Sequence, residues 1–114
     1  MTQVQVELRM SHTVGDVSRA INTTWREPTF EAVFETVLTI GTTLTEIKTH
    51  LSTIEFVIIV PQIDGVVLEV HKNLSPEYWP IEDVFITFDT DIEHLSLKSD
   101  TADTEVYVYL GGSE

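Results

Sequence analysis

Carboxylates on alternate residues between Asp89 and Asp100 are the nearest the sequence comes to a metal-binding motif. Asp89, Asp91 and Glu93 come first, and Asp100 stands at the twelfth position counted from Asp89. Oxygen ligands at the first, third, fifth and last of twelve positions are the layout of an EF-hand calcium loop. The segment therefore has to be considered as a site for a hard cation.

The same segment departs from that motif at the positions that matter most. His94 stands where a glycine makes the sharp turn, and Asp100 replaces the longer, bidentate glutamate. The flanking residues alternate as strands do and do not repeat as helices do. We therefore predict no metal site and keep the four carboxylates as weak candidates only. The expected structure is an acidic loop solvated by water and salt cations.

Other residues that do chemistry are too few or too isolated to form a site. The chain has no cysteine and four histidines. Glu46 and His50 stand four residues apart, as polar neighbours on a helix would, but the His-Glu-x-x-His pattern is absent. No glycine-rich phosphate loop and no Gly-x-Ser-x-Gly elbow is present. We therefore predict no catalytic residue and no cofactor, and we expect a protein that is not an enzyme.

The charge balance is the strongest signal in the composition. Nineteen acidic residues face six basic ones among 114 residues, which gives a formal net charge of −13. Self-repulsion of this size destabilises a compact state in dilute salt. At about 1 M salt the Debye length falls to roughly 3 Å and the repulsion largely vanishes. Diffuse acid, scarce lysine and no cysteine lead us to expect a protein of a salt-loving archaeon or of one of its viruses.

Two other interpretations of the acidic residues stay open. One is an ordinary acidic protein. The other is a mimic of the DNA backbone, whose carboxylates would attract a nuclease or another nucleic-acid-binding enzyme. Direct binding of nucleic acid is not expected, because six dispersed basic residues form no basic patch.

Length and hydropathy predict one domain over residues 1–114, without a leader or a membrane span. The apolar fraction of 42% is that of a folded chain. The start MTQVQVELRM lacks a basic head followed by an apolar run. The longest apolar block, Phe56–Val60, is too short to cross a bilayer. We expect a location in the cytoplasm or in a virion, without contact to a membrane.

Periodicity predicts a strand and then helices in the N-terminal half. Apolar and polar residues alternate strictly over residues 2–10, which predicts a strand. Over residues 11–25 the apolar residues recur at helical spacing, which predicts a short helix. Over residues 27–54 an amphipathic stripe predicts one long helix bent near Gly41, or two helices in tandem.

The C-terminal half predicts antiparallel strands. Residues 55–60 are apolar on both faces, which indicates a central, doubly covered strand, and Asp64-Gly65 predicts a tight hairpin to a return strand. Further strands are predicted at 83–89, 94–98 and 104–110. The fold class is therefore α+β, with an N-terminal strand, a short helix and a long helix packed on an antiparallel β-meander. This element order is similar to that of small phage tail-completion proteins, although no motif supports the resemblance.

Aromatic residues are the candidates for binding a partner. They lie in the predicted last strand, in a proline-bounded loop and in the N-terminal part, at Tyr107, Tyr109, Tyr78, Trp79 and Trp25. Tyrosine and tryptophan favour interfaces because they combine a large area with a polar tip. Their alternative role is ordinary core packing beneath the helices. We predict that these five residues form an interface in a homo-oligomer or larger assembly.

These observations favour a non-enzymatic assembly protein of a halophilic archaeon or its virus. A virion component is one such protein, for example a capsid decoration, a head–tail connector or a tail protein. The first alternative is an acidic DNA-mimic inhibitor. A small enzyme or ligand-binding domain, with a site built from residues distant in sequence, is the remaining one.

Overall fold

The protein is built from strands. The computed structural model describes residues 1–101 and 103–114, leaving out the side chains of Leu8, 10–14, 17–26, Asp89 and Thr90. Every helix or strand in that part of the chain is a strand, so the predicted α+β fold with a short and a long helix is wrong and the protein is all-β. No segment described is a helix long and apolar enough to cross a membrane.

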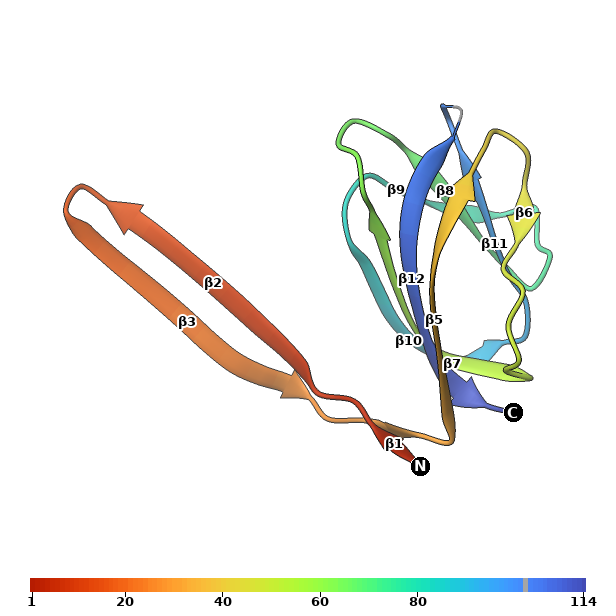
Figure 1. Cartoon of the computed structure of the whole chain (residues 1–114), viewed down its shortest axis with the longest axis horizontal. Helices are drawn as coiled ribbons and strands as arrows, with labels where there is room; N and C mark the ends of the chain where they lie inside the picture. The colour runs from red at the N-terminus through yellow and green to blue at the C-terminus, as the bar shows by residue number, and fades with distance from the viewer. Residues whose placement is uncertain (102) are drawn as a thin grey trace. The chain divides into compact units, whose positions relative to one another are not determined.

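The chain divides into two compact units, Met1–Phe30 and Glu31–Glu114. We call the first unit the ribbon and the second the sandwich. In Figure 1 the ribbon runs from red to orange, and the sandwich continues through yellow and green to blue. The expected single domain over residues 1–114 is not tested by this division and stays a prediction.

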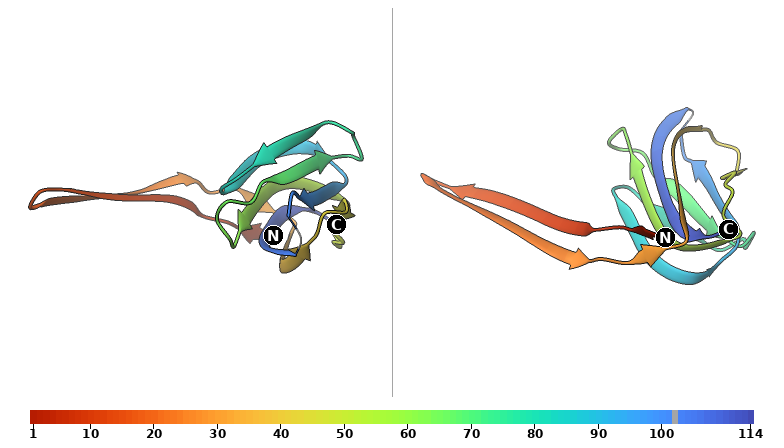
Figure 2. Two further views of the ribbon diagram at one scale, coloured as in Figure 1. Left: turned by 90° about the horizontal axis from the view of Figure 1, so that it is seen from above. Right: turned by 60° about the horizontal axis from the view of Figure 1, so that its bottom comes forward.

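The ribbon is a two-stranded antiparallel hairpin. Each of its two arms is divided into two strands. The first arm contains β1 (Thr2–Gln3) and β2 (Val6–Val14), and the second contains β3 (Val17–Arg26) and β4 (Thr29–Phe30). β2 pairs with β3, and β1 pairs with β4 at the open end of the hairpin. Figure 2 shows β2 and β3 side by side in both views. Gly15 has a φ of 60°, a backbone conformation that glycine adopts without steric cost in a two-residue turn.

The short helix predicted over residues 11–25 is replaced by the turn of this hairpin. Val14 and Val17 have helical spacing, but they also stand opposite each other across the turn at Gly15-Asp16. Glycine and β-branched residues destabilise a helix, whereas glycine is favoured in a tight turn and β-branched residues are favoured in strands. The strand predicted over residues 2–10 corresponds to β1 and the first half of β2.

The sandwich consists of two four-stranded antiparallel sheets around one core (Figure 1). Sheet 1 has the order β10-β7-β12-β5 and sheet 2 has the order β6-β11-β8-β9. The strands are β5 (Ala32–Ile40), β6 (Thr45–Glu46), β7 (Thr53–Pro61), β8 (Leu68–Lys72), β9 (Tyr78–Ile81), β10 (Phe85–Ile92), β11 (Leu95–Ser99) and β12 (Thr104–Ser113). Buried aliphatic side chains from both sheets form the core, among them Ile59 and Val108 from sheet 1 and Leu97 from sheet 2.

The long helix predicted over residues 27–54 is replaced by β4, β5, β6 and the start of β7. The apolar stripe from Phe30 to Leu38 fits a helix, but residues 36–40 contain four β-branched side chains, which favour a strand. Gly41, where a bend or break was expected, follows the end of β5, and its carbonyl accepts a hydrogen bond of 2.9 Å from the Ser99 N–H. Strand pairing thus satisfies the backbone that a helix would have satisfied internally.

The predicted strands of the C-terminal half are present, but their connections differ. Asp64-Gly65 is a turn, and Gly65 has a φ of 81°, yet the strands on its two sides do not form a hairpin. β7 belongs to sheet 1 and β8 to sheet 2, so this connection crosses the sandwich. The proline-bounded loop contains the short edge strand β9, where Pro80 is tolerated because an edge strand needs no N–H on its outer side.

Gly112 tests the register of β12 against β7. A Cβ at this position would collide with the carbonyl oxygen of Thr53. We expect Gly112→Ala to lower the free energy of unfolding by about 1–3 kcal/mol, because the backbone of β7 or β12 must shift. The control is Gly41→Ala, where the nearest atom is Asp103 Oδ1 at 4.0 Å. Urea unfolding at fixed salt should give about 0.5 kcal/mol or less for the control, and equal effects would contradict the register.

Candidate protein interface

The outward face of sheet 1 carries rows of side chains that cross its strands. Residues paired across neighbouring strands share a face of the sheet, and residues two apart in one strand do so as well. The register gives the rows Val37–Tyr107–Val60, Glu35–Tyr109–Ile58–Ile86 and Val33–Gly111–Phe56–Phe88. We call this set of rows, with the adjoining residues Val84 and Glu105, the outer face.

Burial along β12 shows which side of sheet 1 faces solvent. Val106, Val108 and Leu110 are completely buried, and they alternate with Tyr107 and Tyr109, which are partly exposed. The alternation means that the aliphatic residues point into the sandwich core and the tyrosines point away from it. The two tyrosines predicted as interface residues therefore lie together on the outer face.

The outer face is predominantly apolar and keeps large side chains in solvent. Val37 is 58% exposed, Ile86 is 36% exposed, and Val84, two residues before Ile86, is 56% exposed. Ile58 and Val60 between them are half-buried. The four strands of sheet 1 contain no lysine, arginine or histidine. Contiguous apolar surface of this kind marks a site of protein contact.

Aromatic rings pack against one another in the third row. The Phe56 ring lies 4.6 Å from that of Phe88 and 6.2 Å from that of Tyr109, measured between centroids. Phe56 is fully buried although it points away from the core, because these rings cover it and Gly111 opposite leaves room for it. The ring cluster stiffens this part of the outer face, so that a partner meets a preformed surface.

Glu35 places a carboxylate among the tyrosines of the outer face. It is the register partner of Tyr109 and is two residues from Val37, which pairs with Tyr107. Burial raises the pKa of both hydroxyls, and the negative charge of Glu35 raises the pKa of each further. The arrangement offers a carboxylate and two aromatic rings side by side, which suits a cationic group such as a guanidinium.

Sheet 2 presents a different surface, on which charged residues are paired. His94 Nδ1 lies 2.8 Å from Glu46 Oε1, and Lys98 Nζ lies 3.5 Å from Glu69 Oε2. The hydrogen bond from His94 lowers the pKa of Glu46. The sequence suggested His50 as the neighbour of Glu46, but His50 Nε2 lies 3.7 Å from Glu114 Oε1 instead.

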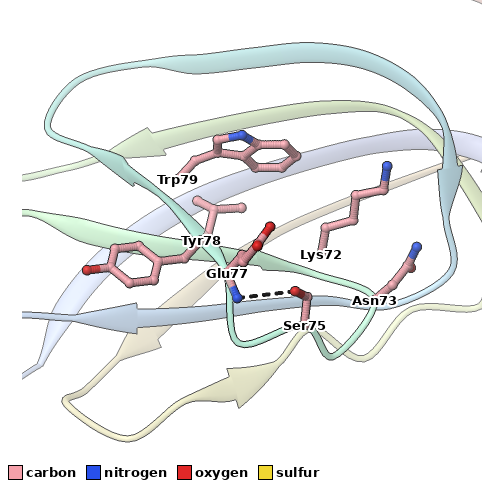
Figure 3. Close-up of a pocket in the computed structure, with 7 residues that line it drawn as sticks. Lys72, Asn73, Ser75, Glu77, Tyr78 and Trp79 are labelled. Carbon is pink, nitrogen blue, oxygen red and sulfur yellow. Dashed lines mark hydrogen bonds between the residues drawn. The ribbon is translucent and has the colours of Figure 1, made fainter.

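Tyr78 and Trp79 lie on the edge strand β9 beside a cavity. They are 50% and 40% exposed. The cavity has a volume of about 330 Å³ and is lined by Val70, Lys72, Asn73, Ser75, Glu77, Tyr78 and Trp79. Figure 3 shows the side chains that line it and the hydrogen bond from the Glu77 N–H to Ser75 Oγ, which is 3.1 Å long.

The polar groups of this cavity serve the structure of its own loop. The Asn73 side chain accepts hydrogen bonds from the N–H groups of Glu93 and His94 and donates one to the carbonyl of Asp91. Ser75 Oγ accepts from Glu77, as described above. The amide of Asn73 and the hydroxyl of Ser75 are therefore engaged within the protein, and Lys72 and Glu77 are the charged side chains that line the cavity.

The predicted metal candidates are spread over two strands, because Asp89 and Asp91 belong to β10 while Glu93 and Asp100 flank β11. Six residues, five of them in β11, separate Glu93 from Asp100. At about 3.3 Å per residue, that separation is far longer than a metal site. Asp100 Oδ1 accepts a hydrogen bond of 3.1 Å from the Val67 N–H. In the part of the chain that the structure describes, no three acidic or histidine side chains gather around one point; the Asp89 side chain lies outside that part.

Part of the candidate site was missed by sequence reasoning. The predicted interface residue Trp25 has a side chain outside the described residues, and Tyr78 and Trp79 are not on the outer face. The missed residues are Val33, Glu35, Val37, Ile58, Val60, Val84 and Ile86. The sequence contained a signal for them in the alternation of β5 and in the apolar residues on both faces of β7. The predicted helix over residues 27–54 concealed the alternation of β5, and it was also expected to cover one face of β7.

Comparison with protein-family models, curated proteins and solved structures finds no match to this chain. A function is therefore inferred from the geometry and charge of the described residues. Among them, the outer face of sheet 1 combines exposed apolar area, ordered aromatic rings and a placed carboxylate. It is the candidate interface.

The position of Glu35 can be checked by titrating the tyrosines. The pKa of Tyr107 and of Tyr109 is raised, so both stay protonated above the ordinary tyrosine value of about 10. Their contribution to stability is complete below that value and is lost as the pH rises through the folded-state pKa. We expect Glu35→Gln to move their ultraviolet transition toward lower pH.

The matched control for this titration is Glu105→Gln, on the same strand as the tyrosines but opposite Thr39. We expect Glu105→Gln to shift the ultraviolet transition of the tyrosines less than Glu35→Gln does. The variants Tyr107→Phe and Tyr109→Phe identify which part of the absorbance change belongs to each residue. A Glu35→Gln titration curve that overlays the wild-type curve would contradict the proximity of Glu35 to the two hydroxyls.

Proposed function

We propose that the protein is a non-enzymatic assembly subunit that binds other protein subunits through the outer face of sheet 1. The observation that carries this proposal is a sheet face that is apolar and part-exposed in a chain with a net charge of −13. The rows of this face contain one acidic residue, Glu35, whereas a protein that only needed to stay dissolved would place more of its nineteen acidic residues there. Retaining the apolar side chains there has a cost in solubility, which a binding role explains.

The area of the outer face suits a stable contact. Its four strands have eight to ten residues each. With strands about 4.8 Å apart and about 3.3 Å per residue, the face measures roughly 15–20 Å by 30 Å. Specific interfaces bury about 800 Å² per partner, and protruding side chains bring the outer face close to that value.

The proposal includes a setting of high salt. Two subunits that each carry −13 repel one another in dilute buffer, whereas at about 1 M salt the Debye length of roughly 3 Å limits that repulsion to groups in contact. Apolar contact and aromatic packing would then provide the attraction. A protein of a halophilic archaeon or of its virus, including a virion subunit, fits this combination of high net charge and apolar contact surface. The cellular and the viral origin are both part of the proposal.

The test of this function replaces apolar residues of the outer face without altering charge or strand propensity. We expect the triple variant Val37→Thr, Val84→Thr, Ile86→Thr to weaken self-association at least about 10-fold, because each hydroxyl adds a desolvation cost. Threonine keeps the branching at Cβ that favours a strand. Sedimentation or light scattering over a range of protein concentrations in molar KCl measures the association.

The matched control changes exposed apolar residues elsewhere, at Ile63, which is 53% exposed, and Leu74, which is 65% exposed. Ile63→Thr with Leu74→Thr should associate as the wild type does. If the wild type is a monomer at every concentration, or if both variants behave alike, the proposal fails. A wild-type monomer that captures a basic DNA-binding enzyme would support the acidic mimic instead.

A further inference from the structure

We infer that the outer face is occupied by the ribbon, residues 1–30, of a second copy of this chain. The inference rests on the proposed function, because it names the partner of the same face. It follows from how charge is divided between the two units, from the architecture of the ribbon and from the groups that the outer face presents.

The net charge belongs entirely to the sandwich. The ribbon contains three acidic residues and all three arginines of the chain, so its formal charge is zero. The sandwich contains the other sixteen acidic residues and all three lysines, which gives −13. The ribbon arginines are Arg9, Arg19 and Arg26. The ribbon is thus the part of a second copy that can approach an acidic sandwich without repulsion from its own net charge.

Two outer faces do not complement one another in the same way. Each contains Glu35 and Glu105 and has no basic residue on its strands. Pressing one face against another would bring like charges together, which costs free energy in a partly desolvated contact. A contact between unlike surfaces, ribbon against face, avoids this cost.

The ribbon has an architecture that needs a partner. Its two long strands pair with each other over nine register positions, and no third strand joins them among the described residues. An isolated two-stranded hairpin is marginally stable in water. Apolar positions stand opposite one another in its register, Met10 with Ile21 and Val14 with Val17. Laying such a hairpin on an apolar sheet would bury both surfaces at once.

The outer face offers the groups that an arginine binds. Glu35 stands beside Tyr107 and Tyr109, a carboxylate flanked by two aromatic rings. On the ribbon, Arg19 is the register partner of His12, and this pair stands between the pairs Met10–Ile21 and Val14–Val17, two positions from each. Guanidinium groups pair with carboxylates in two parallel hydrogen bonds and stack on aromatic rings. An arginine of the ribbon can therefore bind at Glu35.

Each copy has both halves of this contact. A ribbon from one copy on the face of the next is a head-to-tail contact, which produces a reciprocal pair, a ring or an open filament according to the angle between neighbours. All three arrangements share one requirement, that a ribbon and a face come from different copies. That requirement can be tested without knowing which arrangement forms.

The experiment mixes two full-length variants that are each defective in one half of the contact. The face variant combines Glu35→Gln with the three threonine substitutions at Val37, Val84 and Ile86. The ribbon variant replaces Arg9, Arg19 and Arg26 with glutamate. We expect each alone to associate at least about 10-fold more weakly than the wild type, and an equimolar mixture to form a one-to-one heterodimer, since one intact ribbon meets one intact face.

A charge-matched control separates the ribbon from net charge in general. Replacing Lys48, Lys72 and Lys98 with glutamate changes the charge by the same amount but alters only the sandwich. This variant should still associate. The measurements use the lowest KCl concentration at which circular dichroism shows the wild-type fold, because screening reduces the effect of the arginines. If the glutamate ribbon variant does not fold, the same arginines are replaced with glutamine.

The outcomes distinguish this inference from the proposed function. A ribbon variant that associates like the wild type, while the face variant does not, overturns the inference and leaves the proposed function standing. Two defective variants whose mixture stays monomeric would mean that an intact ribbon of one copy does not bind an intact face of another, which also overturns it. Equal loss in the lysine control assigns the effect to net charge and overturns it as well. A wild-type chain that never associates removes the proposed function and, with it, the inference.

Discussion

The pairing of β12 with a strand on each side is the constraint on which the rest of the sandwich depends. β12 bonds to β5 and to β7 over most of its ten residues, so its register decides which side chains of three strands share a face. A slip by one residue would turn the tyrosines inward and the valines outward along the whole strand. Apolar and aromatic residues occupy both faces of these strands, so that slip would be costly on both. The core and the candidate interface are therefore two consequences of one register.

Charged residues are distributed differently over sheet 1, sheet 2 and the ribbon. In the sandwich, Glu46 has Lys48 and Glu69 has Lys98 as a cationic neighbour, while the strands of sheet 1 contain no basic residue. The arginines are confined to the ribbon and the lysines to the sandwich. This separation matters because arginine binds carboxylates and aromatic rings with defined geometry, whereas lysine acts as a hydrated point charge. The chain thus places its selective cation in the unit with no net charge.

Part of this structure could be predicted from the sequence, and the physical reason for the rest is clear. The strand predicted over residues 104–110 corresponds to β12, in which Val106, Val108 and Leu110 alternate with the two tyrosines. The prediction of helices was wrong because the apolar residues from Phe30 to Leu38 fit the periodicity of a helix as well as that of a strand. Pairing between strands outweighs this local spacing. Three features depend on contacts between residues distant in sequence: the crossing from sheet 1 to sheet 2 between β7 and β8, the register beside Glu35, and the uncovered side of β7. Local pattern contains no information about them.

The central claim, that the outer face is covered when the protein assembles, is tested most directly by chemical labelling. The chain has no cysteine, so a single Val37→Cys or Ile63→Cys substitution gives one thiol at a known place. The rate of thiol modification is measured for each protein from dilute to concentrated solution in molar KCl. We expect the thiol at position 37 to become strongly protected as the protein concentration rises, while the thiol at position 63 keeps its rate of modification. Equal rates at both positions across the whole range, in a sample that scattering shows to be assembled, would contradict it.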